Sequence, residues 1–143
     1  MSVAIYQSHL DTIPKQYQLL KLFRPPIYVI GLSNNQVSAV CYYKDGSSKR
    51  HQVNANFSNR RMVIADFLLA VQAITDLLLK FPKHRFGVSG FAAVNVTEEL
   101  AGGLTMIEIK AITEAVWAAA RQAKRGIVSS TVSYQGQPVA VNE

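Results

Sequence analysis

Residues 27–54 read IYVIGLSNNQVSAVCYYKDGSSKRHQVN, and this stretch decides the fold. The apolar run Ile27–Leu32 predicts a buried strand, and Val37–Tyr43 predicts a partner strand directly after it. Lys49–Asn54 predicts a third strand, and its polar composition favours the edge of a sheet. The stretch therefore predicts a meander of three antiparallel strands.

Two short polar segments separate these strands. Ser33-Asn34-Asn35-Gln36 and Lys44-Asp45-Gly46-Ser47 contain the residue types that form tight turns. The Asp-Gly pair is a strong hairpin signal, because both residues tolerate the backbone angles that a two-residue turn requires. Each turn is thus expected to reverse the chain.

The hydrophobic period changes after the meander. Apolar residues recur at helical spacing from Met62 to Phe81, where Pro82 ends the pattern. Phe86–Val96 predicts a strand, in which Gly87 and Gly90 are expected bulge or close-approach points.

A second helix and a last strand complete the pattern. Thr105 and Glu108 have the spacing of a capping box, which predicts a helix to about Ala123 with Ile107, Ala111, Ile112, Ala115 and Ala118 facing inward. Ile127–Tyr134 predicts the last strand. The order β-β-β-α-β-α-β predicts an α/β fold with a mixed five-stranded sheet, and this order matches the ribonuclease-H-like topology.

The domain organisation follows from these elements. Residues 27–135 are expected to form one domain, and residues 136–143 a tail. Residues 1–26 form a lead-in segment, with a short helix expected at Tyr17–Phe23 before Pro25-Pro26. Leu19, Leu20, Leu22 and Phe23 of this segment could fold back over the domain.

Composition excludes several classes of protein. Nearly half of the 143 residues are apolar and 17% are charged, which is typical of a globular domain. No apolar run is long enough to span a membrane, and the first residues do not resemble a signal peptide. The single cysteine, Cys41, excludes an internal disulfide, so we expect a cytoplasmic protein.

Two segments resemble rod-shape-determining (MreB-type) bacterial actin-like proteins. Residues 62–67, MVIADF, are similar to the family's G-V-I-A-D-F segment, and Arg61 and Met62 echo the residues that precede it there. Residues 103–115, GLTMIEIKAITEA, resemble the family's G-x-T-x-V-E-x-R-A-x-x-E-A helix. The resemblance covers about residues 27–130 and implies the N-terminal subdomain of an actin-like fold.

The nucleotide site of that family is not matched. Its first phosphate loop reads D-L-G-T-x-N, whereas this chain has Gly31 in place of the aspartate and Ser33 in place of the glycine. We expect no room for a second domain with its own phosphate loop. The resemblance thus implies the scaffold without the activity, so we predict no catalytic, cofactor-binding or metal-binding residues.

Other chemistry is also disfavoured by the sequence. A two-metal nuclease needs several carboxylates, one of them on the first strand, but Ile27–Leu32 contains none. His9, His51 and His84 are scattered and lack a neighbouring cysteine, which disfavours a zinc site. Cys41 is interpreted as a small apolar filler of its strand.

The first functional hypothesis is therefore a non-catalytic interaction protein that binds itself, most simply as a dimer, or another protein. Candidate interaction residues are Asp66, Trp117, Arg60 and Arg61, although Asp66 could instead stabilise a helix start and Trp117 could pack in the core. An apolar surface is expected around Ile30, Leu32, Val94 and Val96.

The alternative is a nucleic-acid-binding module. The net charge is +6, and the basic residues occur in four groups. A convergence of these groups on one face would favour this alternative: Lys49-Arg50, Arg60-Arg61, Lys83-His84-Arg85 and Lys124-Arg125.

Overall fold

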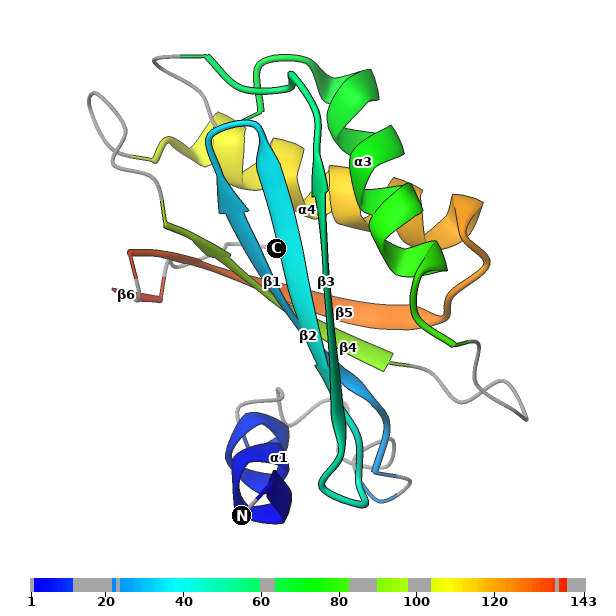
Figure 1. Ribbon diagram of the computed structural model, residues 1–143. Coiled ribbons are helices and arrows are strands. Elements are labelled where there is room, and N and C mark those ends of the chain that lie inside the picture. The colour runs from blue at the N-terminus through cyan, green and yellow to red at the C-terminus, as the bar shows by residue number, and fades with distance from the viewer. Residues whose placement is uncertain are drawn as a thin grey trace.

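The chain folds into one twisted sheet with helices on both of its faces (Figure 1). The computed structural model describes residues 2–11, 22, 24–59, 64–82, 90–97, 104–135 and 137–138. The elements follow in this order: α1 (Ser2–Leu10), β1 (Ile27–Ser33), β2 (Gln36–Tyr42), β3 (Ser48–Asn54), α3 (Phe67–Leu79), β4 (Gly90–Val96), α4 (Met106–Gln122), β5 (Ile127–Tyr134) and β6 (Gln137–Pro138).

The sheet has the spatial order β3-β2-β1-β4-β5-β6. β1, β4 and β5 are parallel neighbours, while β1–β2, β2–β3 and β5–β6 are antiparallel. The predicted α/β class with a mixed sheet is thus present. The five predicted strands are all present, and Gln137 and Pro138 add a short sixth strand that pairs with Tyr134 and Ser133.

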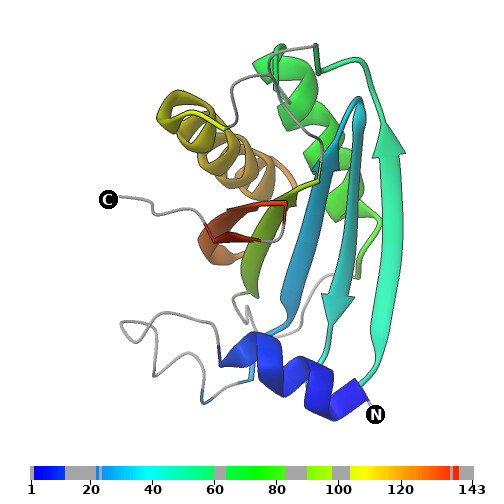
Figure 2. The same ribbon diagram turned by 90° about the vertical axis from the view of Figure 1, so that its left-hand side faces the viewer.

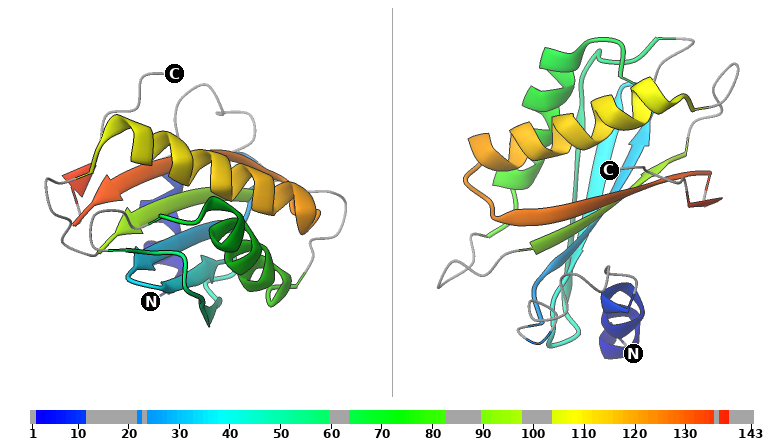
Figure 3. Two further views of the ribbon diagram at one scale, coloured as in Figure 1. Left: turned by 90° about the horizontal axis from the view of Figure 1, so that it is seen from above. Right: turned by 180° about the vertical axis from the view of Figure 1, so that it is seen from behind.

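α3 and α4 cover the same face of the sheet (Figure 3). Alternate residues of each strand point into this layer, and the central ones are fully buried: Tyr28, Ile30, Leu32, Val37, Ala39, Cys41, Ala92, Val94 and Val96. The expected exposed apolar surface around Ile30, Leu32, Val94 and Val96 is therefore wrong. Strand alternation directs these four side chains under the helices.

α1 lies on the opposite face, at one end of the sheet (Figure 2). Tyr6 and Leu10 are buried against Ile27 and Phe91, and the Tyr6 hydroxyl donates a 2.6 Å hydrogen bond to the carbonyl oxygen of Pro25. α1 was not predicted from the sequence. The helix expected at Tyr17–Phe23 lies outside the described residues, except for Leu22, which is exposed.

α3 begins later than its apolar pattern predicts. The pattern starts at Met62, which lies outside the described residues, but the helix begins at Phe67. The backbone N–H groups of Ala65 and Asp66 donate to the carbonyl oxygen of Phe57, at 2.6 and 3.0 Å, which keeps this segment out of the helix. Ile64 is nevertheless buried, so its apolar character reflects loop packing and not helical phase.

Gly90 marks a close approach, as the sequence predicts. A β-carbon at this position would lie 3.0 Å from Tyr28 Cε2 and 3.2 Å from the carbonyl oxygen of Pro26. The register between β4 and β5 also shifts between Gly90 and Phe91. Gly87 lies outside the described residues. Among the helices of the described residues, none is both long and apolar enough to cross a membrane.

Candidate interaction surface

α4 begins at a capping box. The Thr105 hydroxyl accepts a hydrogen bond from the Glu108 N–H at 3.2 Å, and the Glu108 carboxylate accepts one from the Thr105 N–H at 3.0 Å. The helix then buries Ile109, Ile112 and Val116, with three of its alanines, against the sheet and α3. The capping box therefore fixes where α4 starts. Together with the buried residues, this start determines which side chains lie on the outer face of the helix.

The outer face of α4 carries a row of exposed side chains, which we call the α4 stripe: Ile107, Lys110, Glu114, Trp117 and Arg121. Steps of three and four residues place them on one side of the helix. Ile107 is 78% exposed and Trp117 is 58% exposed, and Met106 beside Ile107 is 53% exposed. Large apolar side chains are thus left in solvent on the side opposite the core.

Trp117 is held in place by a neighbour on the next turn. The guanidinium carbon of Arg121 lies 4.7 Å from the centroid of the Trp117 ring. A cation over the face of an indole is attracted by the ring quadrupole. The stripe therefore offers an ordered aromatic surface to a binding partner.

Two expectations about α4 are wrong. The alternative that Trp117 packs in the core is overturned by its exposure, and Ile107, expected to face inward, is the more exposed of the two. The reason is helical phase: the buried face is centred on Ile112, Val116 and Ala119, so positions 107 and 117 point outward.

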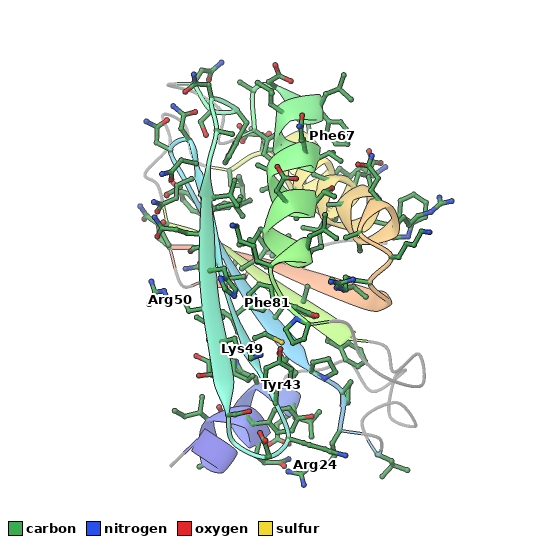
Figure 4. All side chains as sticks on the ribbon, turned by 45° about the vertical axis from the view of Figure 1, so that its right-hand side comes forward. Arg24, Tyr43, Lys49, Arg50, Phe67 and Phe81 are labelled. Carbon is green, nitrogen blue, oxygen red and sulfur yellow. The ribbon has the colours of Figure 1, made fainter. Side chains whose placement is uncertain are left out.

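Asp66 has the structural role that the sequence left open for it. Its side chain accepts a 3.1 Å hydrogen bond from the Leu69 N–H, and its backbone is extended, so it is the N-cap of α3. The apolar residues just after it, Phe67 and Leu68, are exposed, and Phe67 lies at the start of α3 in Figure 4. Arg60 and Arg61 lie outside the described residues.

A tight hairpin occupies the stretch that the resemblance aligns with a phosphate loop. Ser33 pairs with Gln36, and Asn35 has the positive φ of 57° that closes the turn. The Asn35 N–H donates to Ser58 Oγ at 3.0 Å, and Asn35 Oδ1 accepts from the Ser58 N–H at 2.9 Å. These two hydrogen bonds therefore hold the turn against the segment after β3, and the N–H of Asn35 is directed at Ser58.

Cys41 lies in the core under α3, fully buried. Burial raises the pKa of its thiol to about 12, an effect that hydrogen bonds with Tyr43 and Tyr28 and the charge of Lys49 partly oppose. A thiol with this pKa stays protonated near neutrality and is a poor nucleophile. The interpretation of Cys41 as an apolar filler agrees with this position.

The histidines of the described part of the chain pack against aromatic rings. His9 stacks on Tyr42 with a centroid separation of 4.8 Å, and His51 meets the Phe81 ring edge-on at 4.9 Å. Burial lowers the pKa of His9. Within the described residues, no three histidine, cysteine, aspartate or glutamate side chains gather closely enough to hold a metal ion.

The basic groups divide between different environments. Lys49 and Arg50 are exposed on β3, at the sheet edge in Figure 4. Arg125 instead turns inward, and its guanidinium donates to the carbonyl oxygens of Ala123 and Phe81 at 3.0 and 2.8 Å. Lys124 is exposed beside it. All members of the other two groups, Arg60-Arg61 and Lys83-His84-Arg85, lie outside the described residues.

Comparisons with known proteins find several similar chains among solved structures. No family model and no curated protein matches the chain. It is similar to the ethanolamine utilization protein EutJ from Carboxydothermus hydrogenoformans, with 14% identity and a TM-score of 0.47. The likeness covers 93% of this chain and 47% of EutJ, so the chain spans about half the length of that protein. At this identity and TM-score, the likeness assigns neither a family nor a function.

Proposed function

We propose that this chain is a non-catalytic, actin-like domain that binds itself or another protein through the α4 stripe. Its three-strand meander, followed by two crossover helices, supports the ribonuclease-H-like part of this proposal. The two segments that resemble MreB-type proteins support the narrower assignment, since one ends at Phe67, the first residue of α3, and the other includes the first half of α4. The function follows from the surface and not from the fold.

The observation that carries the proposal is the exposure of Trp117. Tryptophan is enriched among the side chains that dominate binding energy, because it removes a large apolar area from water when a partner covers it. Ile107 extends the apolar area along the same helix, while Lys110, Glu114 and Arg121 add charges that can select a partner. The alternating steps of three and four residues are also those by which one helix packs along another.

Two observations support a role without phosphate chemistry. The segment from Ile27 to Gln36 contains no carboxylate that could help to anchor a magnesium ion. The N–H of Asn35, which a phosphate-binding turn would direct at its ligand, donates to Ser58 instead. Both features favour a scaffold that acts by binding.

The experiment compares Trp117→Ala and Ile107→Ala with Leu79→Ala. Leu79 is the matched control, because it is a 54% exposed apolar residue on α3, outside the α4 stripe. All three variants should fold with little loss of stability, since exposed substitutions generally change it by about 0.5 kcal/mol or less. Sedimentation equilibrium at several concentrations measures self-association, and quantitative capture from native cells measures partner binding.

The proposal predicts that Trp117→Ala weakens association at least about tenfold in one of these two assays, while Leu79→Ala leaves it unchanged. Equal association of all three variants would contradict the proposal. Capture of nucleic acid that depends steeply on salt and not on Trp117 would favour the alternative of a basic nucleic-acid-binding module.

A further inference from the structure

β3 presents one free backbone edge. Backbone hydrogen bonds mark the two ends of the β2–β3 ladder. At one end the Tyr43 N–H donates to the Ser47 carbonyl oxygen at 3.0 Å, and at the other the Ala55 N–H donates to the Asn35 carbonyl oxygen at 3.1 Å. Bonded and non-bonded pairs alternate in an antiparallel ladder, so Lys49, His51 and Val53 also bond to β2. The N–H and C=O groups of the intervening residues therefore point away from the sheet: Ser48, Arg50, Gln52 and Asn54.

No described residue pairs with this edge. β3 is the outermost strand in the sheet order, and the backbone hydrogen bonds of the described residues include none to its outer side. Figure 2 shows it as a long strand at the outer edge of the sheet, with no further strand beyond it. The opposite edge is different, because β6 has only two residues and Pro138 has no N–H to donate. β3, by contrast, has no described pairing partner on its outer side along any of its seven residues, so it can accept a strand.

The charge of this edge indicates what kind of strand it accepts. Lys49 and Arg50 are exposed, and as neighbours on a strand they point to opposite faces of the sheet. β3 itself contains no carboxylate, and Asp45 in the preceding turn is engaged by Ser47, whose N–H and Oγ both donate to it. A strand added beside β3 would therefore meet a cation above and a cation below its own plane.

A second copy of β3 does not fit this requirement. Antiparallel pairing of two β3 strands in full overlap places Arg50 of one diagonally across from Arg50 of the other, and like charges at this spacing destabilise the pair. An acidic strand has the opposite effect, since carboxylates at neighbouring positions would reach Lys49 on one face and Arg50 on the other.

We propose that β3 binds an extended acidic segment of a protein partner by strand addition. Backbone hydrogen bonds to the outward groups of Arg50 and Gln52 supply affinity, and the two cations supply selectivity for the acidic segment. This proposal goes beyond the α4 stripe, on which it does not depend, because the two surfaces lie on different elements. Each can therefore fail without the other.

The first test measures binding of a labelled synthetic peptide, Thr-Val-Glu-Glu-Val-Thr, by fluorescence anisotropy. The double variant Lys49→Glu with Arg50→Glu should weaken binding by about tenfold or more, since two attractions become repulsions. The matched control, Lys80→Glu with Lys124→Glu, changes the net charge equally at two exposed lysines outside β3 and outside the α4 stripe, and it should bind within about twofold of the original chain. Equal weakening by both double variants would overturn the proposal.

The second test uses the original chain and needs no variant to fold. Two further peptides carry N-methyl groups, one on alternate amides and one on every amide. A strand can present either of its edges to β3, so the first peptide should retain binding and the second should lose it. Equal binding of both peptides would show attraction between charges alone and overturn strand addition. Preferential binding of a single-stranded oligonucleotide, lost in the Lys49→Glu, Arg50→Glu variant, would also overturn it.

Discussion

Cys41 and Tyr6 are two buried groups whose protons should control stability in alkali. Burial raises the pKa of the Cys41 thiol from 9.0 to about 12. Burial likewise raises the pKa of the Tyr6 hydroxyl from 10.0 to about 12, although Arg24 opposes this. In the unfolded chain both groups ionise near their ordinary values, so above pH 9 the folded chain holds more protons than the unfolded chain.

The free energy of unfolding should therefore fall as the pH rises from 9 toward 12. Each proton that only the folded state retains lowers it by about 1.4 kcal/mol per pH unit. Urea titrations at a series of pH values measure the slope, and Cys41→Ala should make the fall shallower. A stability that stays constant across this range would show that these groups are not buried in the folded state.

Thr105 fixes the start of α4 through a single hydroxyl. Thr105→Ala removes the oxygen that accepts from the Glu108 N–H, and it should lower the free energy of unfolding by about 1 kcal/mol with the fold retained. A matched control is Thr113→Ala, because Thr113 lies within the same helix and its hydroxyl bonds only to helix carbonyls. Equal urea midpoints for Thr105→Ala and the original chain would place the helix start elsewhere.

At the scale of the elements, α1 behaves as part of the folded domain. Leu10 is buried with Tyr6 against Ile27 and Phe91, so Leu10→Ala should lower the free energy of unfolding by about 2–3 kcal/mol. Ile5→Ala is the control on the same helix, since Ile5 is exposed and should change stability little. If both variants unfold at the same urea concentration, α1 is not docked on the sheet in solution.

The strands and the two later helices could be predicted from the periodicity of apolar residues. The first residue of α3 and the solvent-exposed face of α4 could not. Ile64 continues the apolar spacing of α3, so the spacing hides the N-cap at Asp66. α4 has apolar residues on more than one side, which is why Ile107 and Trp117 could not be assigned to an outer face. Among the described side chains of α1, only Tyr6 and Leu10 are buried, which is too few for a recognisable pattern.

At the scale of the whole molecule, the proposal implies that the chain does not bind magnesium-ATP. Gly31 supplies no carboxylate, and the turn that follows it is bonded to Ser58. Isothermal titration of ATP with magnesium should give only the heat of dilution, with magnesium titrated alone as the control. Micromolar, magnesium-dependent binding would contradict the proposal of a non-catalytic domain.

The central claim is that the α4 stripe contacts another protein chain in the cell. A photoreactive phenylalanine analogue placed at Glu114, which leaves Trp117 in place, and in parallel at Leu79, tests this claim most directly. Mass spectrometry then identifies the cross-linked adducts formed in the native cells. The claim predicts a defined adduct, with a second copy or with another protein, from position 114 and none from position 79. The absence of an adduct at position 114, or equal adducts at both positions, would contradict it.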